Sequence, residues 1–154
     1  MPRHGLTRKA PLLIVVASLV LGCSSPASNP EGLSGCDRQV GEYPPDSMTL
    51  VGSTRVEVPY SSWSCPGYHA DNFLEPPSLE IGDDLKIAFE VPIEDGATIE
   101  LNAVVDGERF PLSITDVGSQ AVEVPAGAEE ISIRVCTADL RCAMYVADLV
   151  PKTG

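Results

Sequence analysis

The side chains best suited to chemistry lie in one short segment, residues 60–72. It holds the only tryptophan, Trp63, and the only histidine beyond residue 4, His69. Asp71 follows two positions later, a spacing at which a carboxylate can orient an imidazole that acts as a general base. Three serines of the same segment offer a nucleophile for that base: Ser61, Ser62 and Ser64.

No further catalytic signature accompanies these residues. A nucleophile elbow of the Gly-x-Ser-x-Gly type is absent from the sequence. A zinc site built on one histidine would need Asp71 and other carboxylates as ligands. We therefore predict no catalytic residue, no metal and no cofactor, and keep an enzyme that uses His69 as a minor alternative. That alternative requires His69 to be exposed beside a serine.

The same segment has two non-catalytic interpretations. A strand that runs into the Pro66–Gly67 turn would place Trp63 and Cys65 on one face, where the indole would pack against a disulfide in the core. Alternatively, aromatic rings at the rim of the domain would capture a peptide or a glycan. The candidate contact residues are then Trp63, Tyr68 and His69.

Acidic residues recur in pairs along the chain. Carboxylates on neighbouring loops can collect calcium, but none of the pairs matches a known calcium-loop pattern. Acidic residues are also common in turns because their side chains hydrogen-bond to the nearby backbone, and this is the interpretation we favour. The pairs are Asp83-Asp84, Glu94-Asp95, Asp106-Glu108 and Glu129-Glu130.

The start of the chain has the pattern of a secretion signal. Basic residues precede the apolar stretch Ala10–Leu21, whose 12 residues are too few to span a bilayer as a helix. The next residues, within Val20-Leu21-Gly22-Cys23, resemble the lipobox of bacterial lipoproteins. The resemblance implies cleavage after Gly22, acylation of Cys23 by chains such as palmitate, and a membrane anchor on the extracytoplasmic side, at the cell surface or in the periplasm. The alternative is a plain secretory leader cut near Ala27.

Four cysteines remain once Cys23 is set aside, and an even number in an exported chain favours two disulfides. Cys136 and Cys142 flank a five-residue segment between two strand-like stretches. Antiparallel strands joined by so short a loop bring facing residues within disulfide reach. Of the three pairings that four cysteines allow, we prefer Cys136 with Cys142, which leaves Cys36 with Cys65.

Composition separates a tether from a folded domain and excludes some partners. Residues 23–47 are rich in Ser, Pro, Asn and Gly, which is typical of a flexible tether, although this one contains Cys36. From Cys23 onward the chain has seven Lys and Arg against 22 Asp and Glu, a formal charge of −15. Such a charge argues against binding to nucleic acid and against electrostatic docking on anionic lipid.

The folded part shows the two-residue alternation of β-strands. Leu85, Ile87, Phe89 and Val91 face one way, and four further segments share this period. Asp106-Gly107 between two such segments is a strong hairpin signal. With weaker candidates at 48–51, 54–60 and 110–114, seven to nine short strands predict an all-β, immunoglobulin-like β-sandwich, with a small β-barrel as the alternative. The four further segments are Ile99 to Val105, Val122 to Val124, Ile131 to Val135 and Tyr145 to Leu149.

A second resemblance covers much of this domain. Residues 58–65, 76–79 and 81–89 resemble, in that order, the motifs of uncharacterised bacterial lipoproteins that share a Ser-Tyr-Cys-Trp motif. Asp71 would match the aspartate of those proteins, and the tyrosine strand around Tyr145 would match their last strand. The chain lacks their cysteine just before Trp63. The resemblance implies no activity.

These observations predict four segments: a signal peptide at 1–22, a tether at 23–47, a β-sandwich at 48–151 and a tail at 152–154. We expect a lipid-anchored cell-envelope protein with a non-catalytic binding module for an envelope protein or glycan. The alternative is a structural or accessory envelope protein without a ligand of its own. An exposed Trp63 favours the first function and a buried Trp63 favours the second.

Overall fold

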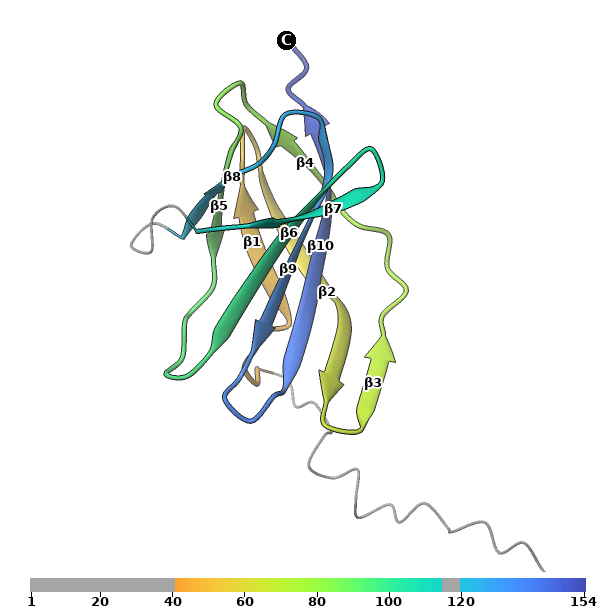
Figure 1. Cartoon of the computed structure of the whole chain (residues 1–154), viewed down its shortest axis with the longest axis vertical. Coiled ribbons are helices and arrows are strands. Elements are labelled where there is room, and N and C mark those ends of the chain that lie inside the picture. Colours follow the sequence, from red (N-terminus) through yellow and green to blue (C-terminus); the bar gives the residue numbers. More distant parts are fainter. Residues whose placement is uncertain (1–40, 115–119) are drawn as a thin grey trace, which may run out of the picture.

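The computed structural model describes residues 41–114 and 120–154. These residues form ten β-strands, and no helix is found in the part of the chain described (Figure 1). Accordingly, no helix able to cross a membrane is found within these two ranges. The strands are β1 (Ser47–Val51), β2 (Arg55–Cys65), β3 (Tyr68–Asp71), β4 (Ser78–Ile81), β5 (Lys86–Glu90), β6 (Thr98–Val105), β7 (Glu108–Leu112), β8 (Ala121–Glu123), β9 (Ala128–Cys136) and β10 (Cys142–Pro151).

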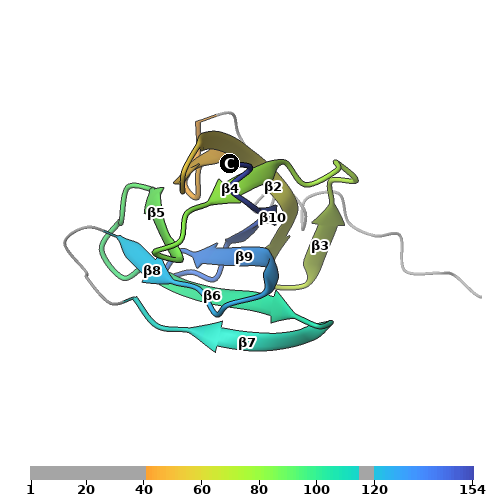
Figure 2. The same ribbon diagram turned by 90° about the horizontal axis from the view of Figure 1, so that it is seen from above.

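The strands form one sheet in the order β7-β6-β9-β10-β2-β1-β5-β8, with β3 beside β2 and β4 beside β10. Every pairing is antiparallel except that of β4 with β10. The first half of β2 pairs with β1, and the second half pairs with β10 and β3. Because β2 changes partners along its length, the sheet curves until it is nearly closed into a barrel (Figure 2). The all-β prediction is confirmed, and this shape is consistent with both the small sandwich and the barrel alternative.

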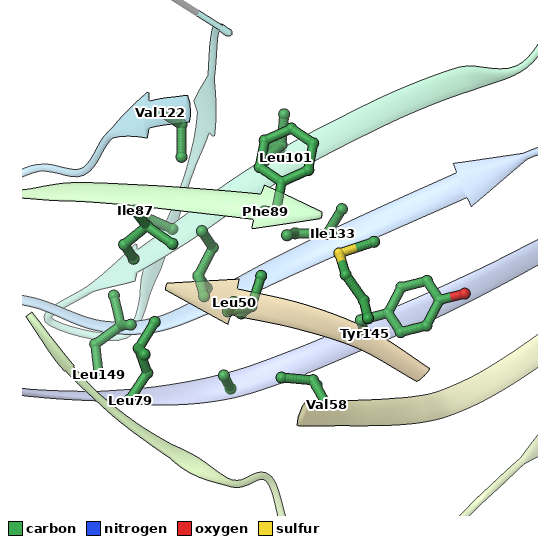
Figure 3. Close-up of a cluster of buried hydrophobic side chains, with 14 of the residues drawn as sticks. Leu50, Val58, Leu79, Ile87, Phe89, Leu101, Val122, Ile133, Tyr145 and Leu149 are labelled. Atoms are coloured by element: carbon green, nitrogen blue, oxygen red, sulfur yellow. The ribbon is translucent and has the colours of Figure 1, made fainter. Parts of the chain in front are cut away.

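The core lies inside this curved sheet and follows the alternation seen in the sequence. Ile87 and Phe89 of β5 are 0% and 1% exposed, whereas Lys86 and Glu90 on the same strand are exposed. Side chains from strands on both sides point toward one another (Figure 3). Each large apolar side chain buried in this way contributes about 1.5–3 kcal/mol. The five strands expected with most support are present as β5, β6, β8, β9 and β10.

The hairpin between β6 and β7 forms as its turn residues predict. Val105 pairs with Glu108, which leaves Asp106 and Gly107 as a two-residue loop. Both loop residues have positive φ, 50° and 78°. Positive φ at both positions is what the tight hairpin turn compatible with strand twist requires.

Two strands were not expected, and β2 is longer than its candidate segment. The β2 strand continues to Cys65 and turns through Pro66 and Gly67, where φ is 81°, into β3. The β4 strand lies parallel to the end of β10, so Leu79 is level with Leu149. Neither of these short strands has a periodic pattern of its own that is long enough to predict it.

Ordered structure begins before Met48, inside the segment assigned to the tether. The phenol of Tyr145 donates a hydrogen bond to the carbonyl oxygen of Pro45, and Tyr43 packs against the core. The folded domain therefore includes residues from at least Tyr43 onward. At the other end, the backbone N–H of Lys152 in the predicted tail donates to the carbonyl of Ile81 at 3.1 Å. The predicted leader, and the tether up to residue 40, lie outside the described residues.

The disulfide between Cys136 and Cys142 is present, and the two residues are directly opposite on β9 and β10 with 4.1 Å between their Cα atoms. The N–H of Thr137 donates to the carbonyl of Arg141 and closes the loop beyond it. Cys65 is also disulfide-bonded. Its predicted partner, Cys36, lies outside the described residues.

Candidate binding surface

Trp63 does not lie on the surface. Its position on β2 points it inward together with Cys65, and the two residues are 3% and 7% exposed. The indole belongs to the same core cluster as Tyr145. The hypothesis that Trp63 contacts a ligand is therefore wrong, because the alternation along β2 assigns its side chain to the core. Trp63 is a core residue, as the alternative interpretation expected.

His69 lies on the opposite face of the hairpin, together with Asp71. The imidazole Nε2 is 2.8 Å from Asp71 Oδ1, and the two side chains are 59% and 51% exposed. Cross-strand pairing places Ser64 level with His69 and Ser62 level with Asp71. An exposed pair of this kind adds at most about 1 kcal/mol to stability. These polar side chains therefore contribute little to the stability of the fold, and their main effect is on the polarity of the surface.

Apolar residues precede and follow this polar pair in the sequence, and the pairing of Tyr68 with Cys65 places Tyr68 on the other face of the hairpin. Tyr68 is 41% exposed, and after β3 the side chains of Phe73 and Leu74 are 94% and 51% exposed. Phe73 is the most exposed large apolar side chain among the described residues. We call residues 68–74 the hairpin surface. The sequence contained a signal for this exposure. Phe73 and Leu74 lie between Asn72 and Glu75, two prolines follow, and no predicted strand would bury the two apolar side chains.

The hairpin surface meets only part of the requirement for catalysis. His69 is exposed, Asp71 can orient it, and Ser64 is level with it. A hydrolytic site would also need oxyanion donors in a site that excludes water. The three clefts discussed next are not lined by His69 or Asp71. His69 is thus exposed with Ser64 level with it, as the enzyme alternative requires, on a hairpin outside these three clefts.

Three shallow clefts lie elsewhere on the domain. The first, about 310 Å³, lies near the end of β10 and has mainly apolar walls, with Asp83 and Lys152 among its lining residues. The second, about 360 Å³, is polar and includes the predicted acidic pair Glu94-Asp95. The third, about 330 Å³, lies beside the disulfide and includes Arg134. Each is at the small end of the range for ligand sites.

In the second cleft, acidic side chains lie close to an arginine. Arg141 contacts Glu42 and lies 3.4 Å from Asp139, so a guanidinium offsets part of the negative charge. Burial raises the pKa of the Tyr43 phenol, and the charge of Glu94 acts in the same direction, while the backbone of Glu94 opposes it. Within residues 41–114 and 120–154, no group of three or more His, Cys, Asp or Glu side chains is arranged to hold a metal ion.

No protein-family model, no curated protein and no solved structure matches this chain. The two resemblances to bacterial lipoproteins therefore depend on the quoted motif residues alone. Function has to be argued from the surface of the domain itself.

Proposed function

We propose that this chain is a lipid-anchored lipoprotein of the bacterial cell envelope, and that its β-domain is a non-catalytic binding module. The lipobox ending at Cys23 supports the anchor. One acyl chain holds a protein at a membrane only marginally, whereas two or more hold it stably. A lipidated Cys23 would therefore keep the domain at the extracytoplasmic face, where an envelope protein or a glycan is within reach.

The observation that carries the binding role is the exposure of Phe73 and Leu74. Phe73, in the segment after β3, is 94% exposed in a domain whose strands bury most of their large apolar side chains. Leaving apolar surface in water is unfavourable, and clustered apolar side chains on a surface commonly mark an interaction site. The proposed contact residues are therefore Tyr68, His69, Phe73 and Leu74. Trp63 is no longer among them.

The alternative is a structural or accessory envelope protein without a ligand. The buried Trp63 favours this alternative, because the aromatic residue first considered for binding has a core role. Phe73 and Leu74 favour the binding module, because nothing in the core requires them. An enzyme that uses His69 is the minor alternative, supported only by the neighbouring Ser64 and Asp71.

The anchor is tested by the mass of the protein purified from membranes, with Cys23→Ala as the comparison. We expect a mature chain that begins at Cys23 and carries acyl groups, and we expect the variant to lose both the acyl mass and the membrane association. An unacylated chain that starts near Ala27 would make the protein a free secreted domain.

The binding surface is tested with a photo-crosslinking amino acid in place of Phe73 in the exported protein. The matched control is the same amino acid in place of Phe110, which is 40% exposed on β7. We expect cross-links to an envelope protein or glycan from position 73 and not from position 110. Cross-links from neither position would support the accessory alternative.

A further inference from the structure

We infer that the partner of the hairpin surface is a second copy of this chain, paired through the open edge of β3. In this arrangement the two β3 strands lie antiparallel about a twofold axis at Ala70. The inference deepens the proposed binding function and depends on it. Its starting point is the backbone of β3, which is paired on one side only within residues 41–114 and 120–154.

The free side follows from the hydrogen bonds of the hairpin. Within the described residues, β3 pairs with β2 alone (Figure 1). The N–H of Asn72 donates to the carbonyl of Ser61 at 2.6 Å. Antiparallel strands alternate hydrogen-bonded and non-hydrogen-bonded pairs, so Ala70 also bonds toward β2. The N–H and C=O groups of His69 and Asp71 then point away from the sheet.

Only one register uses all of these outward groups. If His69 lies opposite the partner's Asp71, then Asp71 lies opposite the partner's His69, and each pair exchanges two hydrogen bonds. A shift of two residues in either direction would place one outward residue opposite the turn or the irregular segment after β3. The favoured register leaves Ala70 opposite the partner's Ala70, in a close pair where a small side chain fits.

The side chains complement each other in the same register. An imidazole then faces a carboxylate across the strands twice, and polar side chains that can hydrogen-bond at directly facing positions stabilise a sheet. Exposed edge strands usually carry Lys or Pro, which discourage pairing. The sequence of β3, Tyr-His-Ala-Asp, contains neither. In contrast, the edge strand β7 contains Pro111.

The same pairing would also shield exposed apolar side chains from water. The register brings Phe73 near the partner's Gly67, at the tip of the partner's hairpin. A Cβ built at Gly67 would meet no atom within 4 Å, so the space above this turn is open for an aromatic ring. The pairing therefore accounts for the exposure of Phe73 as well as for the free backbone groups.

The proposed contact buries little surface, so the two copies are expected to associate weakly. A four-residue strand edge buries less than the roughly 1,200 Å² of a stable interface. The negative charge of each domain opposes association, and salt screens this repulsion. Tethering to one membrane raises the effective concentration of neighbouring copies. Pairing is therefore expected between anchored copies, with stronger association as salt is raised.

The test replaces Ala70 with cysteine in the chain expressed from its first residue, with mild oxidation of intact cell envelopes. The protein's own Cys136–Cys142 bond shows that directly opposite residues of a non-hydrogen-bonded pair reach disulfide distance. We expect a reducible dimer of Ala70→Cys, and a peptide mass that joins the two introduced cysteines. The matched control is Glu108→Cys on the edge of β7, which is expected to remain monomeric.

A charge exchange then tests the register. His69→Asp brings carboxylates into opposition, and we expect the cross-linking rate of Ala70→Cys to fall roughly tenfold. Adding Asp71→His again places an imidazole opposite a carboxylate in both pairs and is expected to restore the rate. Unchanged circular dichroism and a retained Cys136–Cys142 bond show that each variant is folded.

The outcomes separate this inference from the proposed function. A linked pair of introduced cysteines that responds to the charge exchange supports self-pairing. Cross-links from positions 70 and 73 to a different envelope protein or to a glycan overturn self-pairing and leave the binding module intact. Folded variants with no cross-link from either position contradict both.

Discussion

Tyr145 and Pro45 are 100 residues apart in the sequence, and the phenol of Tyr145 donates a hydrogen bond to the carbonyl oxygen of Pro45 at 2.5 Å. Tyr145 is 1% exposed. This bond joins the segment before β1 to β10, the strand that pairs with β2, β4 and β9. The start of the ordered domain is thus fixed to the middle of its sheet.

Tyr145→Phe removes this bond and leaves a part-buried carbonyl without its donor. We expect the free energy of unfolding in urea to fall by about 1–2 kcal/mol. The matched control is Tyr68→Phe, which makes the same chemical change at an exposed position and should leave stability nearly unchanged. Equal effects of the two variants would contradict the role given to the Tyr145 bond.

Replacing Cys136 and Cys142 together with alanine should lower stability while keeping the fold. The bond closes a short loop, and loop entropy predicts a loss of about 2 kcal/mol. Thermal unfolding of the oxidised protein and of the double variant measures the difference. A double variant as stable as the parent would show that β9 and β10 need no covalent link.

Tyr43 should make the domain sensitive to alkali. Its pKa is raised above the ordinary 10.0, first by burial, so the folded chain holds the phenol proton more tightly than the unfolded chain. The contribution to stability is complete below pH 10.0 and is lost as the pH rises through the raised value. Tyr43→Phe cannot ionise, so in urea titrations its stability relative to the parent should improve as the pH rises from about 9 to about 11, after a constant difference at lower pH. A constant difference across this range would refute the assignment.

Ser132 is 3% exposed, and its hydroxyl has no hydrogen-bond partner among the described residues. A buried polar group without a partner costs about 1–3 kcal/mol. Ser132→Ala removes the hydroxyl and nothing else, so we expect unfolding to require more urea. A clear loss of stability would indicate that the hydroxyl has a partner after all.

Trp63 and Phe73 should respond to truncation in opposite ways. Trp63→Ala empties part of the core and is expected to cost about 3–5 kcal/mol. Phe73→Ala changes a side chain in water, so its effect on stability should stay within about 0.5 kcal/mol while cross-linking through the hairpin surface declines. Unfolding curves of the two variants, measured side by side, provide the comparison.

Alternation explains why most of the sheet could be predicted from the sequence. Strands such as β5 and β9 bury one face, so their period of two is visible in the residues themselves. The β4 strand is different, because its four residues become a strand only by pairing with β10, about 70 positions later. The β3 strand likewise exists because a tight turn folds it back on β2. Pairing over such distances leaves no local pattern.

The candidate site was predicted only in part for a related reason. Composition drew attention to Trp63 because tryptophan is rare, but its face on β2 was set by the register with β10 and β3. His69 and Tyr68 lie on the surface as the rim hypothesis required. Phe73 was missed because the Phe73-Leu74 pair has no strand period, and its one signal was that no predicted strand could bury it.

The position of β10 also affects how the protein is made. It is the last strand in the chain, and β2, β4 and β9 all pair with it. While the chain emerges from the ribosome, the earlier strands lack the neighbour that would join them into one sheet. We therefore expect a nascent chain that ends before Cys142 to lack a complete sheet, and the synthesis of residues 142–151 to allow the two groups of strands to join.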